Sequence, residues 1–310
     1  MSTVAEVKPF ESLTADKWKD LLTKIQRKKC TPIIGPEVPF GTLAGRDQLV
    51  EAWGNQLGFP FEDLYHLPRV AQFAATQTNP ADARDAYIER LGETTLYDPD
   101  SAEDPHRILA SLPFPLYLTT NHDSSLYQAL KQRKDRQPRQ KVCPWIPDLD
   151  ESATELSAES KLEVATPVVY HLFGHTEEPR SLVLTEDDHL NFLMSYAADR
   201  QIVPSLVGKE LTKTLLLLLG YRLRDLEFRI LLRFLHRYLE TSIFEKSTIH
   251  LCVQLSDDVK DTTDRSKQLE TMRREFQERD CARMYINVYW GTARQFLSEL
   301  RRRWKEFNGD

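Results

Sequence analysis

Four apolar runs of the sequence each end in glycine, histidine or small polar side chains. The segments concerned are Ile33–Glu37, Leu118–Asp123, Tyr170–His175 and Leu219–Asp225. Polar groups of these types can bind a ligand, and a histidine can also exchange a proton near neutral pH. Taken singly, each segment is more typical of a turn that joins a strand to a helix and supplies its capping residue. The chemistry therefore depends on whether the four ends meet.

Short apolar runs alternate along the chain with segments of helical periodicity, which predicts repeated strand–helix units. An α/β fold follows, with a doubly wound, mostly parallel, Rossmann-like sheet and helical insertions. In such folds ligands bind beyond the carboxyl ends of the strands, where the four segments lie. The predicted strands are Cys30–Ile34, Leu116–Thr119, Lys141–Trp145, Val168–Phe173, Ser181–Leu184, Lys213–Leu219, Thr248–Leu255 and Met284–Tyr289.

The helical pattern divides the chain into a core and an extension. Residues 1–240 form the expected nucleotide-binding core, with a helical insertion near residues 45–112. Residues 241–310 form a βαβα extension that continues the sheet or packs on it as a small cap. The predicted helices are Ala15–Lys29, Arg46–Leu57, Leu64–Ala75, Ala81–Leu91, Pro105–Leu112, Ser124–Lys134, Thr185–Ser195, Leu226–Leu239, Arg265–Gln277 and Thr292–Phe307.

The charge, the apolar content and the cysteine spacing of the chain exclude several classes of protein. A formal net charge of −6 argues against a protein that coats nucleic acid, and the 41% hydrophobic residues suffice for a globular core. The apolar run Leu215–Leu219 is far too short to cross a membrane. The four cysteines have no metal-ligand spacing, and the N-terminus lacks a signal-peptide pattern. We therefore expect a cytoplasmic protein with no metal, no membrane contact and no direct nucleic-acid binding.

The four segments, in this order, resemble the sirtuin-like domain of bacterial NAD hydrolases, many of which act in anti-phage defence. Members of that family show Gly-Ala-Gly, then Thr-Thr-Asn-Tyr-Asp, then Leu-His-Gly, then Gly-Tyr-Ser-Leu-Arg-Asp. The matching stretches here are Gly35–Glu37, Thr119–Asp123, Leu172–Gly174 and Gly220–Asp225. The resemblance extends from about residue 31 to residue 232. It implies NAD as substrate or ligand, and a homo-oligomer or a regulatory protein partner.

The resemblance also implies roles for single residues. Asn121 would orient the ribose and a water molecule, and Asp123 would support its loop. An imidazole would act as acid or base, from His171 or His122, with His175 just past the strand as a further candidate. The first glycine-rich turn and the helix after it would receive the pyrophosphate. Nucleotide contacts are expected at Gly35, Glu37, Thr120, Gly174, Gly220, Tyr221, Arg222 and Asp225.

Four positions depart from the family pattern: Pro36, Glu37, Phe173 and Arg222. Proline has no N–H for a phosphate, and a carboxylate would repel one. Phe173 stands where the family has its histidine. Alternation along a strand predicts that His171 shares the face of Phe173, about 7 Å away, and a packed strand histidine is the alternative.

Two functions therefore remain open. The chain is either an NAD⁺ glycohydrolase that releases nicotinamide and ADP-ribose, or a catalytically inactive subunit that binds NAD or ADP-ribose or assembles a defence complex. Protein deacylation is not expected, because the paired Cys-x-x-Cys ligands of a structural zinc are missing from the sequence.

Overall fold

The computed structural model describes residues 13–40, 43–156, 161–199, 202–222, 225–240, 250–254 and 286–309, with a few positions between 272 and 283. Its centre is a seven-stranded sheet in the order β3-β4-β2-β1-β5-β6-β7, in which every pair of neighbours is parallel. The predicted fold class, a Rossmann-like parallel α/β sheet, is confirmed. The strands are β1 (Cys30–Ile34), β2 (Leu116–Thr119), β3 (Arg139–Val142), β4 (Val168–His171), β5 (Leu215–Tyr221), β6 (His250–Gln254) and β7 (Ile286–Trp290).

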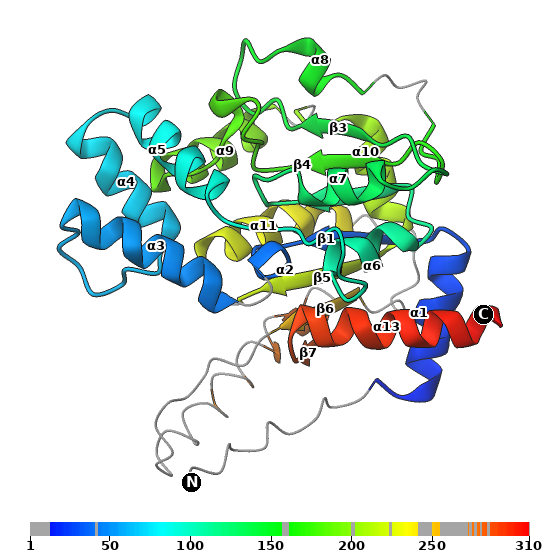
Figure 1. Cartoon of the computed structure of the whole chain (residues 1–310). Helices are drawn as coiled ribbons and strands as arrows, with labels where there is room; N and C mark the ends of the chain where they lie inside the picture. The colour runs from blue at the N-terminus through cyan, green and yellow to red at the C-terminus, as the bar shows by residue number, and fades with distance from the viewer. Residues whose placement is uncertain are drawn as a thin grey trace, which may run out of the picture.

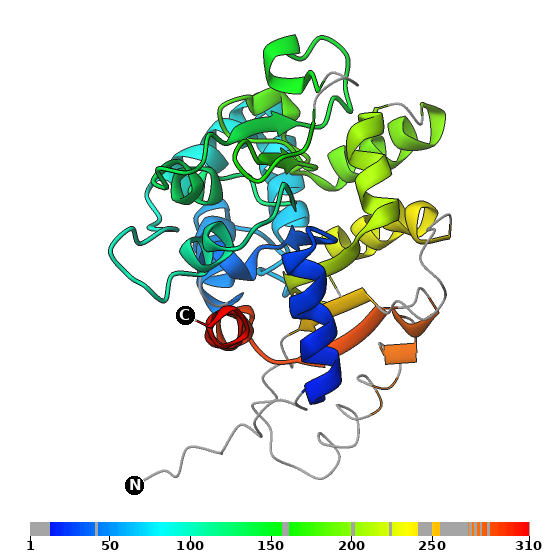
Figure 2. The same ribbon diagram turned by 90° about the vertical axis from the view of Figure 1, so that its right-hand side faces the viewer.

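Helices cover both faces of the sheet, which explains why its central strands are apolar on both sides. On one face lie α1 (Ala15–Gln26), α6 (Pro105–Ser111), α7 (Ser125–Lys131) and α13 (Ala293–Asn308), packed into one buried cluster. On the other lie α9 (Glu186–Ala198), α10 (Ser205–Lys213) and α11 (Leu226–Glu240). Figure 2 shows α1 and α13 beside each other, away from α11.

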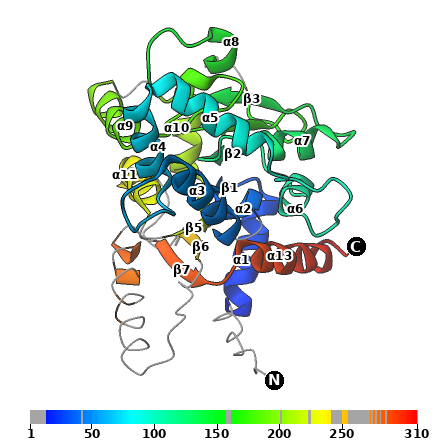
Figure 3. The same ribbon diagram turned by 60° about the vertical axis from the view of Figure 1, so that its left-hand side comes forward.

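A third group of helices lies at the end of the sheet toward which the strands point (Figure 1). It consists of α3 (Leu43–Leu57), α4 (Leu67–Gln77) and α5 (Pro80–Gly92), preceded by the short α2 (Glu37–Phe40). These helices have a hydrophobic cluster of their own around Trp53 and Val70. They come to the front in Figure 3, where α3 lies over the ends of β1 and β5. They therefore form a roof over the carboxyl ends of the strands.

Side-chain hydrogen bonds cap the first turns of α1 and α9. Thr14 accepts a hydrogen bond from the N–H of Lys17 at the start of α1. Thr185 and Asp188 form a reciprocal capping box at the start of α9. Both helices begin where these hydroxyl groups satisfy N–H groups that have no partner within the helix.

One predicted strand was wrong, and two helices were missed. The expected strand Ser181–Leu184 is absent: a 3₁₀ turn, Pro179–Ser181, is followed by extended chain, and Leu182 and Leu184 pack under the roof helices rather than pairing in the sheet. The structure also contains α10 and a short α8 (Glu151–Thr154), neither of which was predicted. Most of the predicted helix Arg265–Gln277 lies outside the described residues.

The C-terminal strands belong to the same sheet as the core. β6 pairs with β5, and β7 pairs with β6. Phe296, Leu297 and Leu300 of α13 pack in the cluster that also holds α1 and α6. The division of the chain at residue 240 stays a prediction.

Candidate functional site

The ends of β1, β2 and β5 meet at the point where the strand order reverses, the usual place for a ligand in an open parallel sheet. The side-chain amide of Asn121 donates to the carbonyl oxygen of Gly35 over 3.0 Å. The hydroxyl group of Thr120 lies 3.1 Å from that of Tyr221. Three of the four sequence segments thus meet at this point, and the fourth contacts Leu118–Asp123 through the hydrogen bond from His171 to the backbone oxygen of Asn121.

A bulge in β5 determines how Tyr221 is oriented. The pairing of β5 with β6 shifts between Leu219 and Tyr221, and Gly220 between them has a φ of +75°. Strand alternation would place Tyr221 on the face of Leu219, but the bulge turns it to the opposite face, against Phe228. Its buried ring therefore lies over the turn that follows β1.

Gly35 allows this close approach. A Cβ at that position would lie 2.7 Å from both the carbonyl oxygen of Gly220 and the ring of Tyr221. The N–H of Gly35 donates to the carbonyl oxygen of Leu219 over 2.8 Å, so this donor is used within the sheet. Gly35 acts here as the residue that lets β1 and β5 pack, and its contact with a pyrophosphate stays a prediction.

A cavity of about 30 Å³ lies between the strand ends and the roof helices. That is enough for one or two water molecules. Several predicted site residues reach it, together with residues of six helices, α2, α3, α4, α5, α9 and α11, that the sequence did not suggest as site residues. The lining residues are Pro36, Pro39, Phe40, Arg46, Leu67, Tyr87, Leu91, Thr120, Asn121, His122, Asp123, Phe173, Val183, Leu184, His189 and Glu227.

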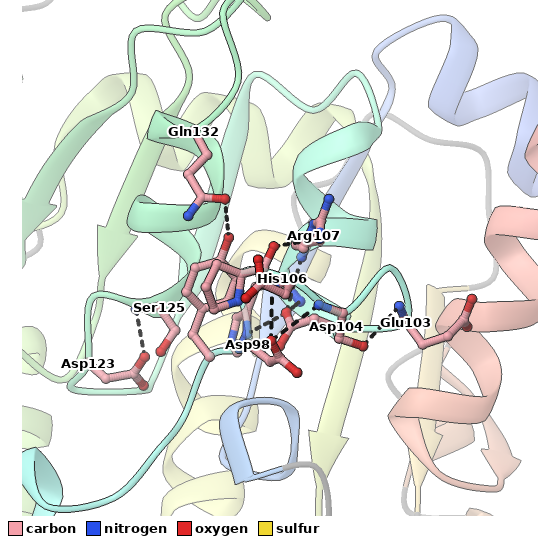
Figure 4. Close-up of polar contacts among 12 residues, drawn as sticks. Asp98, Glu103, Asp104, His106, Arg107, Asp123, Ser125 and Gln132 are labelled. Carbon is pink, nitrogen blue, oxygen red and sulfur yellow. Dashed lines mark hydrogen bonds and ion pairs between the residues drawn. The ribbon is translucent and has the colours of Figure 1, made fainter.

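Asn121 is held at the edge of this cavity in a fixed orientation. Its backbone N–H donates to the hydroxyl group of Thr119, and its Nδ2 donates to Gly35. The side-chain Oδ1 is therefore the atom left to accept a hydrogen bond from a ligand hydroxyl group or a water molecule. Asp123 also lines the cavity and accepts from the N–H of Ser125, which secures the start of α7 (Figure 4).

His171 does not lie where strand alternation predicted. β4 ends at His171, and beyond it both Leu172 and Phe173 turn into the cluster on the α9–α11 face. Val169, which shares the face of His171 along β4, packs in the opposite cluster. The expectation that His171 and Phe173 share a face is therefore wrong, because the strand ends between them.

The bonds of His171 leave it outside the cavity. Its Nδ1 donates to the backbone oxygen of Asn121 over 2.9 Å, and its ring packs edge-on against His175. Burial lowers the pKa of His171 to about 4, so the ring is neutral at pH 7. In this conformation His171 supports the loop that carries Asn121, and its assignment as an acid or base stays a prediction.

His175 and Ser124 do not form a nucleophilic pair. The N–H of Glu177 donates to Nδ1 of His175, so Nε2 carries the proton and donates to the Ser124 hydroxyl group over 2.9 Å. An imidazole in this tautomer cannot remove a proton from the serine. Burial lowers the pKa of His175 to about 2.

Two other imidazoles reach the cavity with a buried nitrogen that has no hydrogen-bond partner. These atoms are Nε2 of His122 and Nε2 of His189. His122 faces the hydroxyl group of Tyr87 through its Nδ1, and burial lowers its pKa to about 3. Since buried polar atoms are nearly always paired, two unpaired nitrogens at one cavity indicate a place for water molecules or for a polar ligand. His189 was missed from the sequence, where it reads only as part of a helix.

Ion pairs close the roof over this cavity. Arg46 at the start of α3 pairs with Glu227 and, over 3.6 Å, with Asp225. Next to it on the same helix, Asp47 binds the guanidinium group of Arg222 through both oxygens. Arg222 and Asp225 were predicted nucleotide contacts, and in this conformation both are engaged with α3.

Glu37 points away from the cavity. Its Oε1 accepts the N–H of Ala293 at the start of α13, over 3.1 Å, and its Oε2 is buried without a partner. Burial raises the pKa of this carboxyl group to about 7. Glu37 thus joins the turn after β1 to the C-terminal helix, and no carboxylate is directed at the cavity from this position.

Gly174 has a structural requirement of its own. Its φ is +85°, and a Cβ there would lie 2.1 Å from the carbonyl oxygen of Ser181. The turn after β4 therefore needs glycine whether or not a nucleotide binds nearby. Phe173, just before it, is buried at the cavity and packs edge-on against the ring of His189, with the ring centroids 5.3 Å apart.

A second polar cluster, around Asp104, is structural. Its carboxylate accepts from the N–H groups of Asp98, His106 and Arg107, and so caps α6 (Figure 4). In the described ranges no three histidine, cysteine or acidic side chains are grouped to hold a metal ion. None of the helices described is both long and apolar enough to cross a membrane.

The fold and the cavity together define a parallel α/β protein of the open-sheet class, with its candidate site at the reversal of strand order. Residues 115–276, just over half of the chain, match the family described as SIR2-like domain, and the chain belongs to this family.

Two curated relatives are similar over part of their length. The NAD(+) hydrolase ThsA of Acinetobacter baumannii (strain 532279) is 26% identical over 224 residues, which cover 70% of this chain and 42% of the relative. The NAD(+) hydrolase ThsA of Enterococcus faecium is 30% identical over 191 residues, covering 59% of this chain and 36% of the relative. The chain thus matches less than half the length of either relative.

Proposed function

We propose that this protein hydrolyses NAD⁺ at the bond between nicotinamide and ribose, giving nicotinamide and ADP-ribose. Water adds to the anomeric carbon of the ribose, the carbon–nitrogen bond breaks with its electron pair leaving on nicotinamide, and one proton of the water is released. Membership of the SIR2-like family and two relatives named NAD(+) hydrolase support this proposal.

The observation that carries the proposal is the position of Asn121. It lies at the carboxyl end of β2, with its amide held by Gly35 and its Oδ1 available, at a cavity lined by unpaired imidazole nitrogens. These groups fit a sugar, since hydroxyl groups can both donate to a nitrogen lone pair and interact with an amide oxygen. Asn121 would orient the ribose and the attacking water, and Asp123 would hold its loop.

The cavity as described is too small for the nicotinamide and its ribose. Entry of the substrate therefore requires side chains of the roof to move, and Arg46 and Leu67 of α3 and α4 are among those that line it. We infer that the described conformation is a closed form of the site. Control by self-assembly or by a protein partner, and a role in anti-phage defence in the cytoplasm, are part of the proposal and rest on the resemblance to the family.

A fluorescent etheno-NAD assay at high protein concentration tests the proposal. Wild-type protein should release the fluorescent product, and Asn121→Ala should lower the rate by about 100-fold or more. Asn55→Ala, at an exposed asparagine of α3, is the matched control and should behave as wild type. Silence of the wild-type protein over the whole concentration range would contradict hydrolysis.

A second function is favoured by three observations. Phe173 replaces the histidine of the family pattern, the N–H of Gly35 is used within the sheet, and Tyr221 covers the turn after β1. These features suit a subunit that binds NAD or ADP-ribose without cleaving it. Calorimetric binding of ADP-ribose by a protein that shows no turnover would establish that alternative.

A further inference from the structure

His189 presents a nitrogen lone pair to the cavity, and its tautomer is fixed by the backbone. Nδ1 lies 2.8 Å from the carbonyl oxygen of Thr185, which can only accept, so Nδ1 must carry the proton. Nε2 is then an acceptor, and it is buried without a hydrogen-bond partner. His122 differs, because its Nδ1 faces a tyrosine hydroxyl group that can donate or accept.

The position of His189 is rigid. It follows the capping box of Thr185 and Asp188, which fixes the first turn of α9. The same Asp188 pairs with Arg84 of the roof helix α5 over 2.7 Å. The backbone N–H of His189 also donates to Thr185, so ring and backbone are held by one carbonyl group. A group held in this way needs little reorganisation when it reacts.

The contact with Phe173 places the imidazole of His189 beside the position at which the family pattern has its histidine. Phe173 occupies the corner after β4 at which the family pattern has histidine, and its ring packs against that of His189. Both side chains line the same cavity. The imidazole of His189 therefore lies with its centroid 5.3 Å from that of the Phe173 ring, at the corner where the family pattern has its histidine.

The charges around His189 suit a group that gains a proton during a reaction. Burial lowers the pKa of His189, which keeps the ring neutral and its lone pair free at pH 7. Glu227 and Asp188 both favour the protonated ring, and Arg46 disfavours it. Arg46 is itself paired with Glu227. A protonated His189 would therefore lie between two carboxylates, Glu227 and Asp188, and the positive charge of Arg46 is already offset by Glu227.

We propose that His189 is the base of the hydrolysis, an assignment that rests on the proposed function. Nε2 accepts one proton from the attacking water as the oxygen of that water bonds to the anomeric carbon and nicotinamide leaves with the electron pair of the broken bond. The proton then passes from His189 to bulk water, which restores the neutral ring. Asn121 orients the ribose, and Phe173 packs the base in place.

Kinetics of two variants test the assignment. His189→Gln should lower kcat for NAD⁺ by about 100-fold to 1,000-fold, with the affinity for ADP-ribose changed by less than about threefold. The double variant Phe173→His/His189→Phe returns an imidazole to the corner after β4 and should recover at least about tenfold of the loss. His236→Gln, on α11 and away from the cavity lining, is the matched control and should keep wild-type activity.

Nuclear magnetic resonance gives a readout that does not depend on turnover or on the folding of a variant. Wild-type protein carrying ¹⁵N-histidine should show His189 as the Nδ1–H tautomer, and ADP-ribose should shift its Nε2 resonance while leaving that of His236 in place. A protonated Nε2, or an Nε2 signal unmoved by bound ADP-ribose, would overturn the assignment.

The outcomes separate the two proposals. If Asn121→Ala abolishes hydrolysis while His189→Gln stays within threefold of wild type, hydrolysis stands and the assignment of His189 fails. If wild-type protein does not hydrolyse NAD⁺ at any concentration, the proposed function fails and the assignment fails with it.

Discussion

The buried ion pairs of Arg46 offer a sharp test of how the roof is held on the sheet. The Arg46 side chain is only 6% exposed, and its partners Asp225 and Glu227 are 9% and 12% exposed. Replacing Arg46 with methionine keeps most of the buried volume but removes the cation that Asp225 and Glu227 share. The perturbation therefore removes charge compensation and little else.

The expected cost is large because both carboxylates stay out of water. Removing one partner from a buried pair typically costs about 3–5 kcal/mol, whereas exposed pairs contribute about 0–1 kcal/mol. With an unfolding entropy of roughly 2.1 cal/mol/K per residue, that loss lowers the melting temperature by about 5–8 °C for a chain of this length. Glu227→Gln added to Arg46→Met removes one uncompensated charge and should restore about 1–2 kcal/mol.

Urea unfolding followed by circular dichroism measures these differences in the free energy of unfolding. Arg302→Met is the matched control, since the Arg302 side chain is 52% exposed and pairs with Glu299 and Glu306 on the surface of α13. It should change stability by less than about 0.5 kcal/mol. If Arg46→Met costs no more than Arg302→Met, the roof is not held by this ion pair and the reasoning fails.

Two further predictions concern Glu37 and Gly174. The pKa of Glu37 is raised from 4.5 to about 7, so the folded state binds more protons than the unfolded state between these values. The stability of wild-type protein should therefore fall as pH rises through this window, by on the order of 3 kcal/mol, relative to Glu37→Gln. Urea unfolding of both proteins at pH 5 and pH 8 measures this effect. If the difference in the free energy of unfolding between wild type and Glu37→Gln is the same at both pH values, the burial of Glu37 is contradicted. Gly174→Ala should cost more than about 2 kcal/mol, because φ is positive and the added Cβ would meet Ser181. Gly92→Ala, at the end of α5 with open space around it, is the control and should be neutral or slightly stabilising in the same titration.

Local order could be predicted where neighbouring residues determine it. The boundaries of β1 and β2 were predicted to the residue, since a continuous apolar run that ends in a glycine or polar turn leaves few alternatives. The start of α9 was predicted in the same way, because Thr185 and Asp188 satisfy each other's backbone within one turn. Leu182 and Leu184 misled the prediction, since apolar residues at alternate positions suit a strand and an extended chain under the roof equally well.

The candidate site could be located from the sequence but not resolved into roles. Polar residues after parallel strands meet at one rim for topological reasons, and Asn121, His122 and Asp123 do line one cavity there. The orientation of His171 could not be foreseen, since it depends on β4 ending one residue before Leu172. The partners of Arg222 and Asp225 lie on α3, more than 170 residues away in the chain.

The amino-acid sequence alone determined the α/β class and the corners that meet at the candidate site, because both follow from patterns within about ten consecutive residues. Only the tertiary structure decided which side chains face the cavity. A bulge turns Tyr221 over Gly35, Glu37 is directed to α13, and the first turn of α9 brings His189 against Phe173. These contacts join residues distant in the chain, and their geometry is determined by packing.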